Sequence, residues 1–404
     1  MQDNLVEEIS TALLSEPVNL SQLCKRLEME LNLPSGEVQH LIYQIVAQLN
    51  AKFFPPVACM ELILTEGCNL KCSYCFENEM IRHKKMTEKV ARYAIDLLFD
   101  YSQNENKLSI THFGGEPLLN FPMVQFVTEY AEEKARLTGK SVDFNMTSNG
   151  ILLNESMAEY LDEHKINVLL SIDGCESTHD RHRVDKKGRG TFSRVMKSMR
   201  ILKRTQPWIG TKMTVMPDNV ASLFEDILGL YSMGVNQFMI GHATGVEWSE
   251  KERETYGREM RKIAKWYREE RRGDLRIAEL DAEDKGSSFF GCRAGRNSIS
   301  ISVDGEISSC SKVLSLNNRQ LLAKLGDVEY GLTNISNRFE LINCIKLRSA
   351  CEALGIAGDF QGGCFATNYN ETGALFQPGL QEHEFSLLER SIRLEFAPVL
   401  NRAT

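Results

Sequence analysis

Three closely spaced cysteines are the residues of this chain best suited to chemistry. Cys68, Cys72 and Cys75 lie in the stretch Glu66-Gly-Cys-Asn-Leu-Lys-Cys-Ser-Tyr-Cys-Phe76, with the spacing C-x3-C-x2-C. Thiolates hold iron–sulfur clusters, and a four-iron cluster normally takes four of them. Three thiolates can hold three irons and leave the fourth iron open for another ligand. A zinc knuckle is the alternative, but no fourth Cys or His follows at the spacing of such a site.

The remaining cysteines are concentrated far along the chain. The sequence has eleven cysteines, and five of them lie between positions 292 and 364. The N-terminal residues lack the basic and apolar regions of a signal peptide, and no run of about 18 apolar residues predicts a membrane span. These features predict a cytoplasmic protein without membrane contact. Cytoplasmic cysteines rarely form disulfides, so two cysteine clusters indicate metal sites.

Short β-branched runs alternate with segments of helical periodicity through the middle of the chain. Strands are predicted at Met60–Thr65, Leu108–Phe113, Val142–Thr147, Asn167–Ile172, Lys212–Met216 and Gln237–Ile240. Helices are predicted at Thr87–Asp100, Met123–Thr138, Glu155–His164, Phe192–Arg204, Asn219–Met233 and Glu250–Arg272. This alternation predicts parallel strands joined by right-handed crossovers. Six such units are too few for an eight-stranded barrel, so the predicted α/β fold is an open six-stranded (β/α)6 partial barrel.

Polar or glycine-rich segments follow the first four predicted strands. The cysteine loop follows the first strand, and Gly114-Gly-Glu-Pro117 follows the second. Ser148-Asn-Gly150 follows the third, and Asp173-Gly174 follows the fourth. In parallel β/α folds, binding residues gather at the carboxyl ends of the strands. We therefore expect these four segments to face one cavity.

The cysteine spacing and the aromatic residues on either side of Cys75 resemble those of the radical S-adenosylmethionine (radical SAM) enzymes. In that family the open iron binds the amino and carboxylate groups of S-adenosylmethionine (AdoMet). The resemblance extends over roughly residues 58–245. It implies that Glu116 contacts the ammonium group of AdoMet and that Arg183 forks onto its carboxylate. The segment Ser171-Ile-Asp-Gly174, followed by Arg183, resembles an S-x-D-G…R pattern of the peptide- and protein-modifying branch of the family. The implied AdoMet contacts are Tyr74, Gly114, Gly115, Glu116, Ser148, Asn149, Ser171 and Arg183.

Several side chains near these motifs are interpreted as structural. His179, Arg181 and His182 lie beside Arg183 and are expected to form a solvated basic loop. Cys24, Cys59 and Cys175 are interpreted as ordinary thiols.

The C-terminal cysteines resemble those of a SPASM domain, the extension that carries auxiliary Fe–S clusters in radical SAM enzymes. The opening is matched by Cys292 and Cys310, with Gly305 between them. The family continues with C-x2-C-x5-C-x3-C, but Leu354 and Phe360 stand at two of those positions here. Leucine and phenylalanine cannot ligate iron, so a second auxiliary cluster is not expected. The resemblance implies one auxiliary cluster held by Cys292, Cys310 and Cys364, with Cys351 or Cys344 as fourth ligand or with one iron open.

Three domains are expected: a helical module at 1–52, the radical SAM partial barrel at 53–280 and an auxiliary-cluster domain at 281–404. The first is predicted to contain helices at Leu5–Ser15, Leu20–Leu31 and Ser35–Leu49, with Ser35 as the cap of the third. A plain helical lid and a leader-peptide-binding module both remain open. Leader-binding modules usually begin with strands that bind by strand addition, and residues 1–20 show no clear strand.

The resemblance implies an enzyme that reductively cleaves AdoMet to a 5′-deoxyadenosyl radical and takes hydrogen from a residue of a ribosomally made peptide. The product would be a crosslink, a thioether or a modified backbone. The implied partners are a precursor peptide and a reducing protein such as flavodoxin or ferredoxin. The net charge of −8 argues against a general nucleic-acid binder.

Two alternatives remain open. One is a sulfatase-maturase-like protein oxidase, but such relatives carry an aspartate base where this chain has Ser311. The other is a non-catalytic Fe–S electron-transfer protein, which would not need the polar residues that the resemblance assigns to AdoMet.

Overall fold

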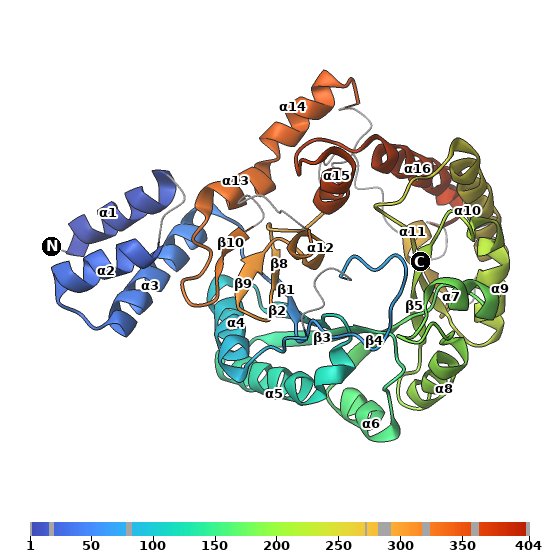
Figure 1. Cartoon of the computed structure of the whole chain (residues 1–404), viewed down its shortest axis with the longest axis horizontal. Helices are drawn as coiled ribbons and strands as arrows, with labels where there is room; N and C mark the ends of the chain where they lie inside the picture. Colours follow the sequence, from blue (N-terminus) through green and yellow to red (C-terminus); the bar gives the residue numbers. More distant parts are fainter. Residues whose placement is uncertain are drawn as a thin grey trace. The chain divides into compact units, whose positions relative to one another are not determined.

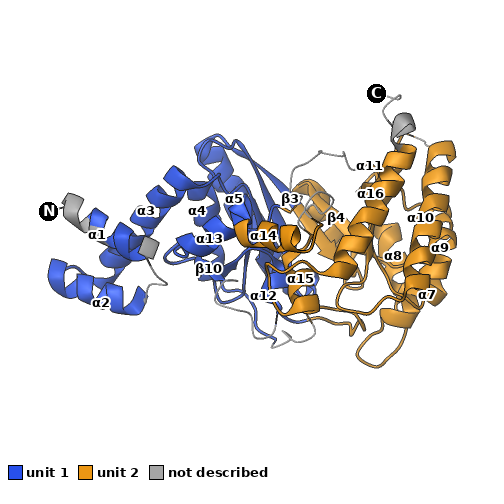
Figure 2. Cartoon of the chain, turned by 90° about the horizontal axis from the view of Figure 1, so that it is seen from above, with its two compact units in different colours: residues 1–67, 79–144, 293–344 blue, residues 68–78, 145–292, 345–404 orange. Residues whose placement is uncertain are grey.

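The protein forms two compact units, each assembled from segments far apart in the sequence (Figure 2). Unit 1 contains residues 1–67, 79–144 and 293–344, and unit 2 contains residues 68–78, 145–292 and 345–404. The computed structural model describes residues 2–15, 20–77, 83–270, 273–281, 292–316, 324–356 and 363–400. The predicted domain boundaries after residues 52 and 280 stay predictions.

Unit 1 begins with three helices, α1 (Gln2–Ser15), α2 (Leu20–Leu31) and α3 (Ser35–Phe53) (Figure 1). These confirm the three predicted N-terminal helices. The predicted cap is wrong by one position, because Pro34 is the N-cap of α3 and Ser35 is its first helical residue. Pro34 has a ψ of 148°, which is extended backbone, so the helix can start only after it.

A mixed sheet with the strand order β10-β9-β8-β1-β2 lies in unit 1. Strand β1 (Cys59–Ile63) pairs in parallel with β2 (Lys107–Phe113) on one side and with β8 (Ser298–Ile301) on the other. Strands β9 (Glu306–Ser308) and β10 (Lys324–Asp327) continue it in antiparallel pairing. The helical elements of this unit after α3 are α4 (Glu88–Tyr101), η1 (Pro117–Asn120), α5 (Phe121–Thr138), α12 (Ser311–Leu314) and α13 (Ile335–Asn343). The first two predicted strands are confirmed, whereas β8, β9 and β10 were not predicted.

Unit 2 contains the parallel strands β4 (Ile166–Ser171), β5 (Gly210–Val215), β6 (Gln237–His242) and β7 (Arg276–Ile277), in that order. Strand β3 (Ser141–Ser148) begins in unit 1 and ends in unit 2. Apolar side chains such as Val168, Met213 and Ile240 are buried. The fold is therefore α/β with mostly parallel strands, as predicted, and closure into a partial barrel stays a prediction.

The helices of unit 2 include the predicted ones and several more. They are α6 (Glu155–Glu163), α7 (Glu176–His182), α8 (Phe192–Leu202), η2 (Val220–Ser222), α9 (Leu223–Ser232), α10 (Glu250–Glu270), α11 (Ala278–Asp281), α14 (Ile345–Ala353), α15 (Phe365–Thr372) and α16 (Leu380–Leu400). Helix α16 packs along α10 (Figure 1). Within the described part of the chain, no helix is long and apolar enough to cross a membrane.

Candidate functional site

The loop that carries the three cysteines belongs to unit 2 and is tied to the chain that follows α7. The backbone N–H of Lys71 donates to the carbonyl of Val184 at 2.8 Å, and that of Ser73 donates to the carbonyl of His182 at 3.1 Å. Cys72 is 8% exposed, while Cys68 and Cys75 are half-buried. The loop is therefore held by backbone bonds at its centre, with sulfurs on both sides of this attachment.

A buried carboxylate organises the side chains around this loop. Asp173, two residues after β4, accepts from Nε and Nη2 of Arg183 at 2.9 and 3.1 Å, which is a bidentate pair. The hydroxyl of Tyr74 also donates to Asp173, and so does the backbone N–H of Thr214 at 2.9 Å. The remaining terminal nitrogen of Arg183, Nη1, lies 3.9 Å from Sγ of Cys72. The guanidinium also lies over the Tyr74 ring, 5.4 Å from its centroid.

Two histidines predicted to be solvated are buried instead. His179 is 0% exposed, and its Nε2 lies 3.0 Å from Oγ1 of Thr191. His182 is 7% exposed and lies between Ser73 Oγ at 2.8 Å and Asp218 Oδ1 at 2.9 Å. Burial, together with the positive charge of Arg183, lowers the pKa of His179 to about 4. The prediction of a solvated basic loop is therefore wrong for both histidines, because contacts from distant segments cover them.

The end of β3 reaches the same cysteine loop. Nδ2 of Asn149 donates to Oδ1 of Asn69 at 2.8 Å and lies 3.9 Å from Sγ of Cys68. Oγ of Ser148 accepts from the backbone N–H of Gly150 at 2.9 Å, which fixes the turn. Unit 2 thus contains the three cysteines together with Tyr74, Ser148, Asn149, Ser171 and Arg183.

The glycine-rich segment lies in unit 1, against the residues that precede Cys68. A Cβ on Gly115 would lie 2.5 Å from the carbonyl oxygen of Gly67, and one on Gly114 would lie 2.3 Å from that of Thr65. Gly114 also has a φ of 130°, which disfavours any other residue. Glu116 is buried, and its Oε1 accepts from the N–H of Leu118 at 3.1 Å. The two glycines therefore allow the chain just before the cysteine loop to approach this segment closely.

The donor set of the loop fits an iron–sulfur cluster. Burial raises the pKa of Cys72, and it raises the pKa of Cys75 to about 11 with help from the charge of Glu77. Metal ligation requires thiolates, so binding iron here would release protons. None of the described cysteines forms a disulfide. In the part of the chain that the structure describes, no three His, Cys, Asp or Glu side chains are grouped as a single metal ion would require. A cluster differs in this respect, because each thiolate binds its own iron.

The C-terminal cysteines lie at the ends of short elements in both units. Cys310 precedes α12, and its Sγ accepts from the N–H of Val313 at 3.4 Å. Cys364 precedes α15, and Cys292 comes directly after a stretch outside the described residues. All three are half-buried. Cys310 belongs to unit 1, whereas Cys292 and Cys364 belong to unit 2.

The two candidates for a fourth auxiliary ligand are the most deeply buried of the five. Cys344 is 1% exposed, has a φ of 52° and donates from Sγ to the carbonyl of Leu341 at 3.1 Å. Cys351 is 0% exposed, and burial raises the pKa of its thiol to about 11. Leu354 is 46% exposed near the end of α14, and Phe360 lies outside the described residues.

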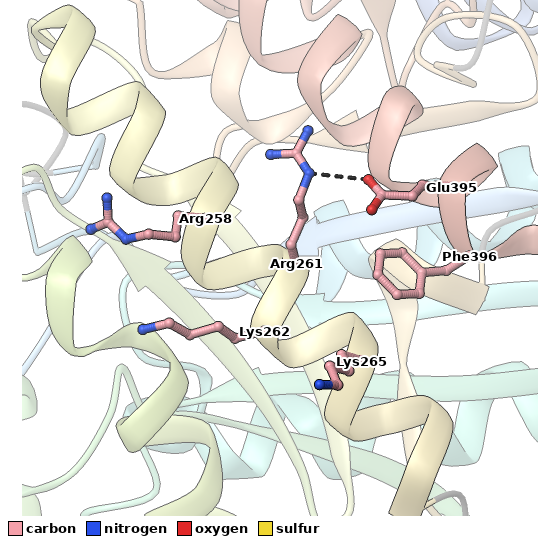
Figure 3. Close-up of a pocket in the computed structure, with 6 residues that line it drawn as sticks. All are labelled: Arg258, Arg261, Lys262, Lys265, Glu395 and Phe396. Atoms are coloured by element: carbon pink, nitrogen blue, oxygen red, sulfur yellow. Dashed lines mark hydrogen bonds and ion pairs between the residues drawn. The ribbon is translucent and has the colours of Figure 1, made fainter.

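A surface pocket of about 450 Å³ in unit 2 contains none of the predicted site residues (Figure 3). Four of its lining residues are basic and lie on one face of α10. Glu395 of α16 pairs with Arg261 at 3.1 Å, and Lys262 pairs with the buried Glu259 at 2.8 Å. Arg258 also pairs with Glu259 at 3.4 Å, so the four basic side chains share two carboxylates and the pocket keeps an excess of positive charge.

The sequence between β1 and α9 matches a known family. Residues 62–230 match the model of the Radical SAM superfamily. This region is a radical SAM domain. The resemblance predicted from the cysteine spacing is thereby confirmed for this region.

Several curated proteins resemble the chain around this domain. An uncharacterised protein of Methanocaldococcus jannaschii is 34% identical over 43% of this chain and 58% of its own length. The radical SAM cyclopropyl synthase TigE of Paramaledivibacter caminithermalis is 27% identical over 43% of this chain and 38% of its own length. The chain thus spans about half the length of these two relatives. A serine-type anaerobic sulfatase-maturating enzyme of Klebsiella aerogenes is 23% identical over 74% of this chain and 77% of its own length.

Solved structures show the same fold over most of the chain. The enzyme anSMEcpe with bound AdoMet and Cp18Cys peptide has a TM-score of 0.66 at 18% identity, covering 86% of this chain and 98% of its own. Streptococcus suis SuiB bound to its precursor peptide SuiA has a TM-score of 0.58 at 16% identity, covering 92% and 88%. At such identities the likeness establishes the radical SAM fold alone.

Asp173 is the functional candidate to which sequence reasoning gave no role. The S-x-D-G motif contains it, and Arg183 follows ten residues later. An acidic residue after a predicted strand, with an arginine one short helix away, is the signal from which the pair could have been inferred.

Proposed function

We propose that the chain is a radical SAM enzyme that modifies a residue of a ribosomally made peptide. The observation that carries the proposal is the attachment of the three-cysteine loop to the ends of β3 and β4 within one unit. A loop with a purely structural role would not need three half-buried or buried thiols surrounded by amide, guanidinium and phenol groups. The matching Radical SAM superfamily model covers this whole arrangement.

Cys68, Cys72 and Cys75 would hold the AdoMet-binding four-iron cluster, which leaves one iron open. Bound there, the cluster and AdoMet would supply one electron and a 5′-deoxyadenosyl group that can take a hydrogen atom from carbon. Glu116, whose Oε1 caps η1, would accept from the ammonium group of AdoMet. Asn149, Ser148 and Ser171 would supply polar contacts to the rest of the molecule.

A peptide substrate is supported by what the similar proteins are called. One similar solved structure contains the bound Cp18Cys peptide, and another contains the bound precursor peptide SuiA. One auxiliary cluster, held by Cys292, Cys310 and Cys364, and a reducing partner such as flavodoxin or ferredoxin complete the proposal. Hydrogen abstraction can lead to a crosslink, a thioether or a backbone change.

Sulfatase maturation is a second candidate, favoured by the Klebsiella relative that aligns over three quarters of both chains. Ser311 stands in this chain where such relatives carry an aspartate base. In unit 1 the N–H of Ser311 donates to Oε2 of Glu61 at 3.2 Å, and burial raises the pKa of that carboxyl. A carboxyl group is therefore present beside this position, but it comes from β1.

The proposal is tested in two steps with the full chain. The reduced protein is incubated with AdoMet, and 5′-deoxyadenosine is measured against a variant in which Cys68, Cys72 and Cys75 are all changed to Ala. The precursor peptide from a neighbouring short reading frame is then added, and its mass is measured beside that of a sulfatase peptide. Release of 5′-deoxyadenosine without any mass change in the precursor peptide would remove the peptide assignment. No release from the reduced wild-type protein would remove the enzyme assignment.

A further inference from the structure

Arg183 is already paired with a carboxylate of the protein, Asp173. The side chain of Asp173 is 0% exposed and that of Arg183 is 9% exposed, so both charges are removed from water. Two of the guanidinium nitrogens already bind the carboxylate. Bidentate arginine–carboxylate pairs are strong and fix the orientation of both groups. The direction of Nη1 is therefore set by Asp173, and that direction is toward Cys72.

Tyr74 adds a second link between the same carboxylate and the cysteine loop. Its position lies between Cys72 and Cys75 in the sequence, and its hydroxyl donates to Oδ2 of Asp173. Its ring lies under the Arg183 guanidinium. Asp173 itself is fixed to β5 by the N–H of Thr214. One carboxylate thus joins the rigid end of the sheet to the loop through two side chains.

We propose that Asp173 is a positioning residue for the AdoMet-binding cluster, acting through Arg183 and Tyr74 on Cys72. This inference rests on the proposed function. Arg183 donates from Nη1 toward the Cys72 sulfur, and Tyr74 keeps the turn between Cys72 and Cys75 in place. Hydrogen bonds to cluster sulfurs are among the factors that set how a cluster behaves. No described hydrogen bond joins Asp173 to a cysteine, so its effect on the geometry of the loop passes through these two neighbours, beside the direct effect of its charge on Cys72.

Asp226 offers a matched control in the same unit. It is 4% exposed, and it accepts from the N–H of Cys175 at 2.7 Å and from Oγ1 of Thr178 at 2.8 Å. Asp226 belongs to α9, and its partners lie at the start of α7. It is thus a second buried, hydrogen-bonded carboxylate, with no described bond to the cysteine loop. Asp173→Asn and Asp226→Asn both keep the shape of the side chain and remove one charge. A difference between the two variants therefore reports on the link to the loop.

The experiment measures how fast a chelator removes iron from the reconstituted full chain, together with the EPR spectrum of the reduced cluster and thermal stability. Asp173→Asn weakens charge-assisted bonds, so we expect iron loss to be about tenfold faster and the EPR spectrum to change. Asp226→Asn should leave both near the wild-type result even where it lowers thermal stability. Tyr74→Phe, which removes only the hydroxyl, should accelerate iron loss in the same direction by a smaller factor.

Each outcome supports or overturns the proposal. Equal rates of iron loss in Asp173→Asn and in wild type would overturn it, and so would equal acceleration in both aspartate variants. If Asp173→Asn does not fold, Tyr74→Phe decides alone, and a wild-type rate and spectrum in that variant would overturn the proposal. Failure of the proposed function is distinguishable, because it would appear as a wild-type protein that binds no cluster or that leaves AdoMet uncleaved.

Discussion

The Cys68–Cys75 loop and the C-terminal cysteines differ in what surrounds their sulfur atoms. The first three thiols lie in one unit, on one loop, beside an arginine, an amide and a buried carboxylate that fix their neighbours. The C-terminal thiols are divided between two units, and Cys310 and Cys364 lie at the N-termini of short helices. A site whose surroundings are already in place can accept a cluster with little rearrangement, whereas cysteines at element ends depend more on the cluster for their order.

This difference predicts that substitution of either cysteine group removes only the iron that this group binds. Changing Cys68, Cys72 and Cys75 to Ala should remove about four irons per chain and all AdoMet cleavage, because cleavage needs the open iron. Changing Cys292, Cys310 and Cys364 to Ala should remove a separate set and leave cleavage in place. Iron analysis of the wild-type protein should give about eight irons per chain if both sites hold four-iron clusters.

Other iron contents would change the assignment of the C-terminal cysteines. About twelve irons per chain would show a second auxiliary cluster despite Leu354 and Phe360, and about four would make the C-terminal cysteines ordinary thiols. Unchanged iron content and cleavage in the first triple variant would remove the assignment of the Cys68–Cys75 loop.

A buried arginine supports the C-terminal cysteine region, and its loss should be the largest effect on stability. Arg338 is 1% exposed and donates to Oδ1 of Asn50 and to the carbonyls of Pro55, Gly295 and Arg296. Arg338→Ala leaves these acceptors without their donor, so we expect a loss of about 4 kcal/mol in the free energy of unfolding.

Urea unfolding measures this loss against Arg26→Ala, which removes an exposed i,i+4 pair on α2. The control should change stability by less than about 0.5 kcal/mol. Because Arg338 fixes the turn just after Cys292, its variant should also lose auxiliary iron before it loses the first cluster. Simultaneous loss of both clusters would mean that the two regions depend on each other.

Arg183→Ala should have an effect of intermediate size on AdoMet binding beside the Cys68–Cys75 loop. The resemblance assigns Arg183 to the AdoMet carboxylate, although two of its nitrogens already bind Asp173; loss of that contact should weaken AdoMet binding by roughly 1.5–3 kcal/mol, or about ten- to hundred-fold in affinity. The structure adds a cost to stability, since Asp173 would be left buried without its cation. A titration of the cluster-loaded protein with AdoMet measures the affinity, and unaltered affinity would assign Arg183 to the loop alone.

The stabilisation that α16 gives to unit 2 through His242 should depend on pH. The ring of His242 stacks on that of Phe385 of α16, with the ring centroids 3.9 Å apart. Its Nε2 lies 3.4 Å from Oε2 of Glu382, and its Nδ1 lies 3.7 Å from Oε1 of Glu389. These carboxylates raise the pKa of His242 to about 9, against burial, which lowers it. Because the folded pKa lies above the ordinary value of about 6.5, the stabilisation is complete below that pH and disappears as pH rises toward 9.

The size of this effect is at most about 3.4 kcal/mol, and thermal unfolding between pH 6 and pH 9.5 measures it. His242→Gln removes the titrating group and should flatten this part of the profile. Other groups titrate above pH 9 in both proteins, so the difference between the two profiles is the quantity of interest. Identical profiles would show that the ion pairs contribute nothing.

The regular part of the fold could be predicted because its signals are local. The six strands β1 to β6 and the helices α4, α5, α6, α8, α9 and α10 follow from periodicity, and their bounds lie within two residues of the predicted ones, except that α9 begins four residues later. The short strand β9 and the helix α7 are only three and seven residues long, and their sequences have no clear period. Their formation depends on partners elsewhere, as in the pairing of β9 with β8 and β10.

The candidate site could be predicted in its residue types but not in its bonds. The cysteines and the S-x-D-G…R pattern are visible in the sequence. The burial of His182, by contrast, comes from Ser73, which lies 109 residues away in the chain, and from Asp218. The pairing of Asp173 with Arg183 and Tyr74 likewise forms only when the cysteine loop meets the end of β4. Such long-range contacts leave no local pattern.

The smallest expected effect concerns the fourth auxiliary ligand. Cys344→Ser and Cys351→Ser should each leave the iron content unchanged, so that the auxiliary cluster keeps one open iron. The sulfur of Cys344 already donates to the carbonyl of Leu341, and ligation would break that bond. Cys351 is 0% exposed and lies within α14, so ligation would first have to expose its sulfur. Iron analysis and EPR of both variants check this. A loss of about one iron or of the whole auxiliary cluster in either variant would identify that cysteine as the ligand. It would also show that the C-terminal region rearranges when iron binds, which the Cys68–Cys75 loop, with its surroundings already bonded, does not need to do.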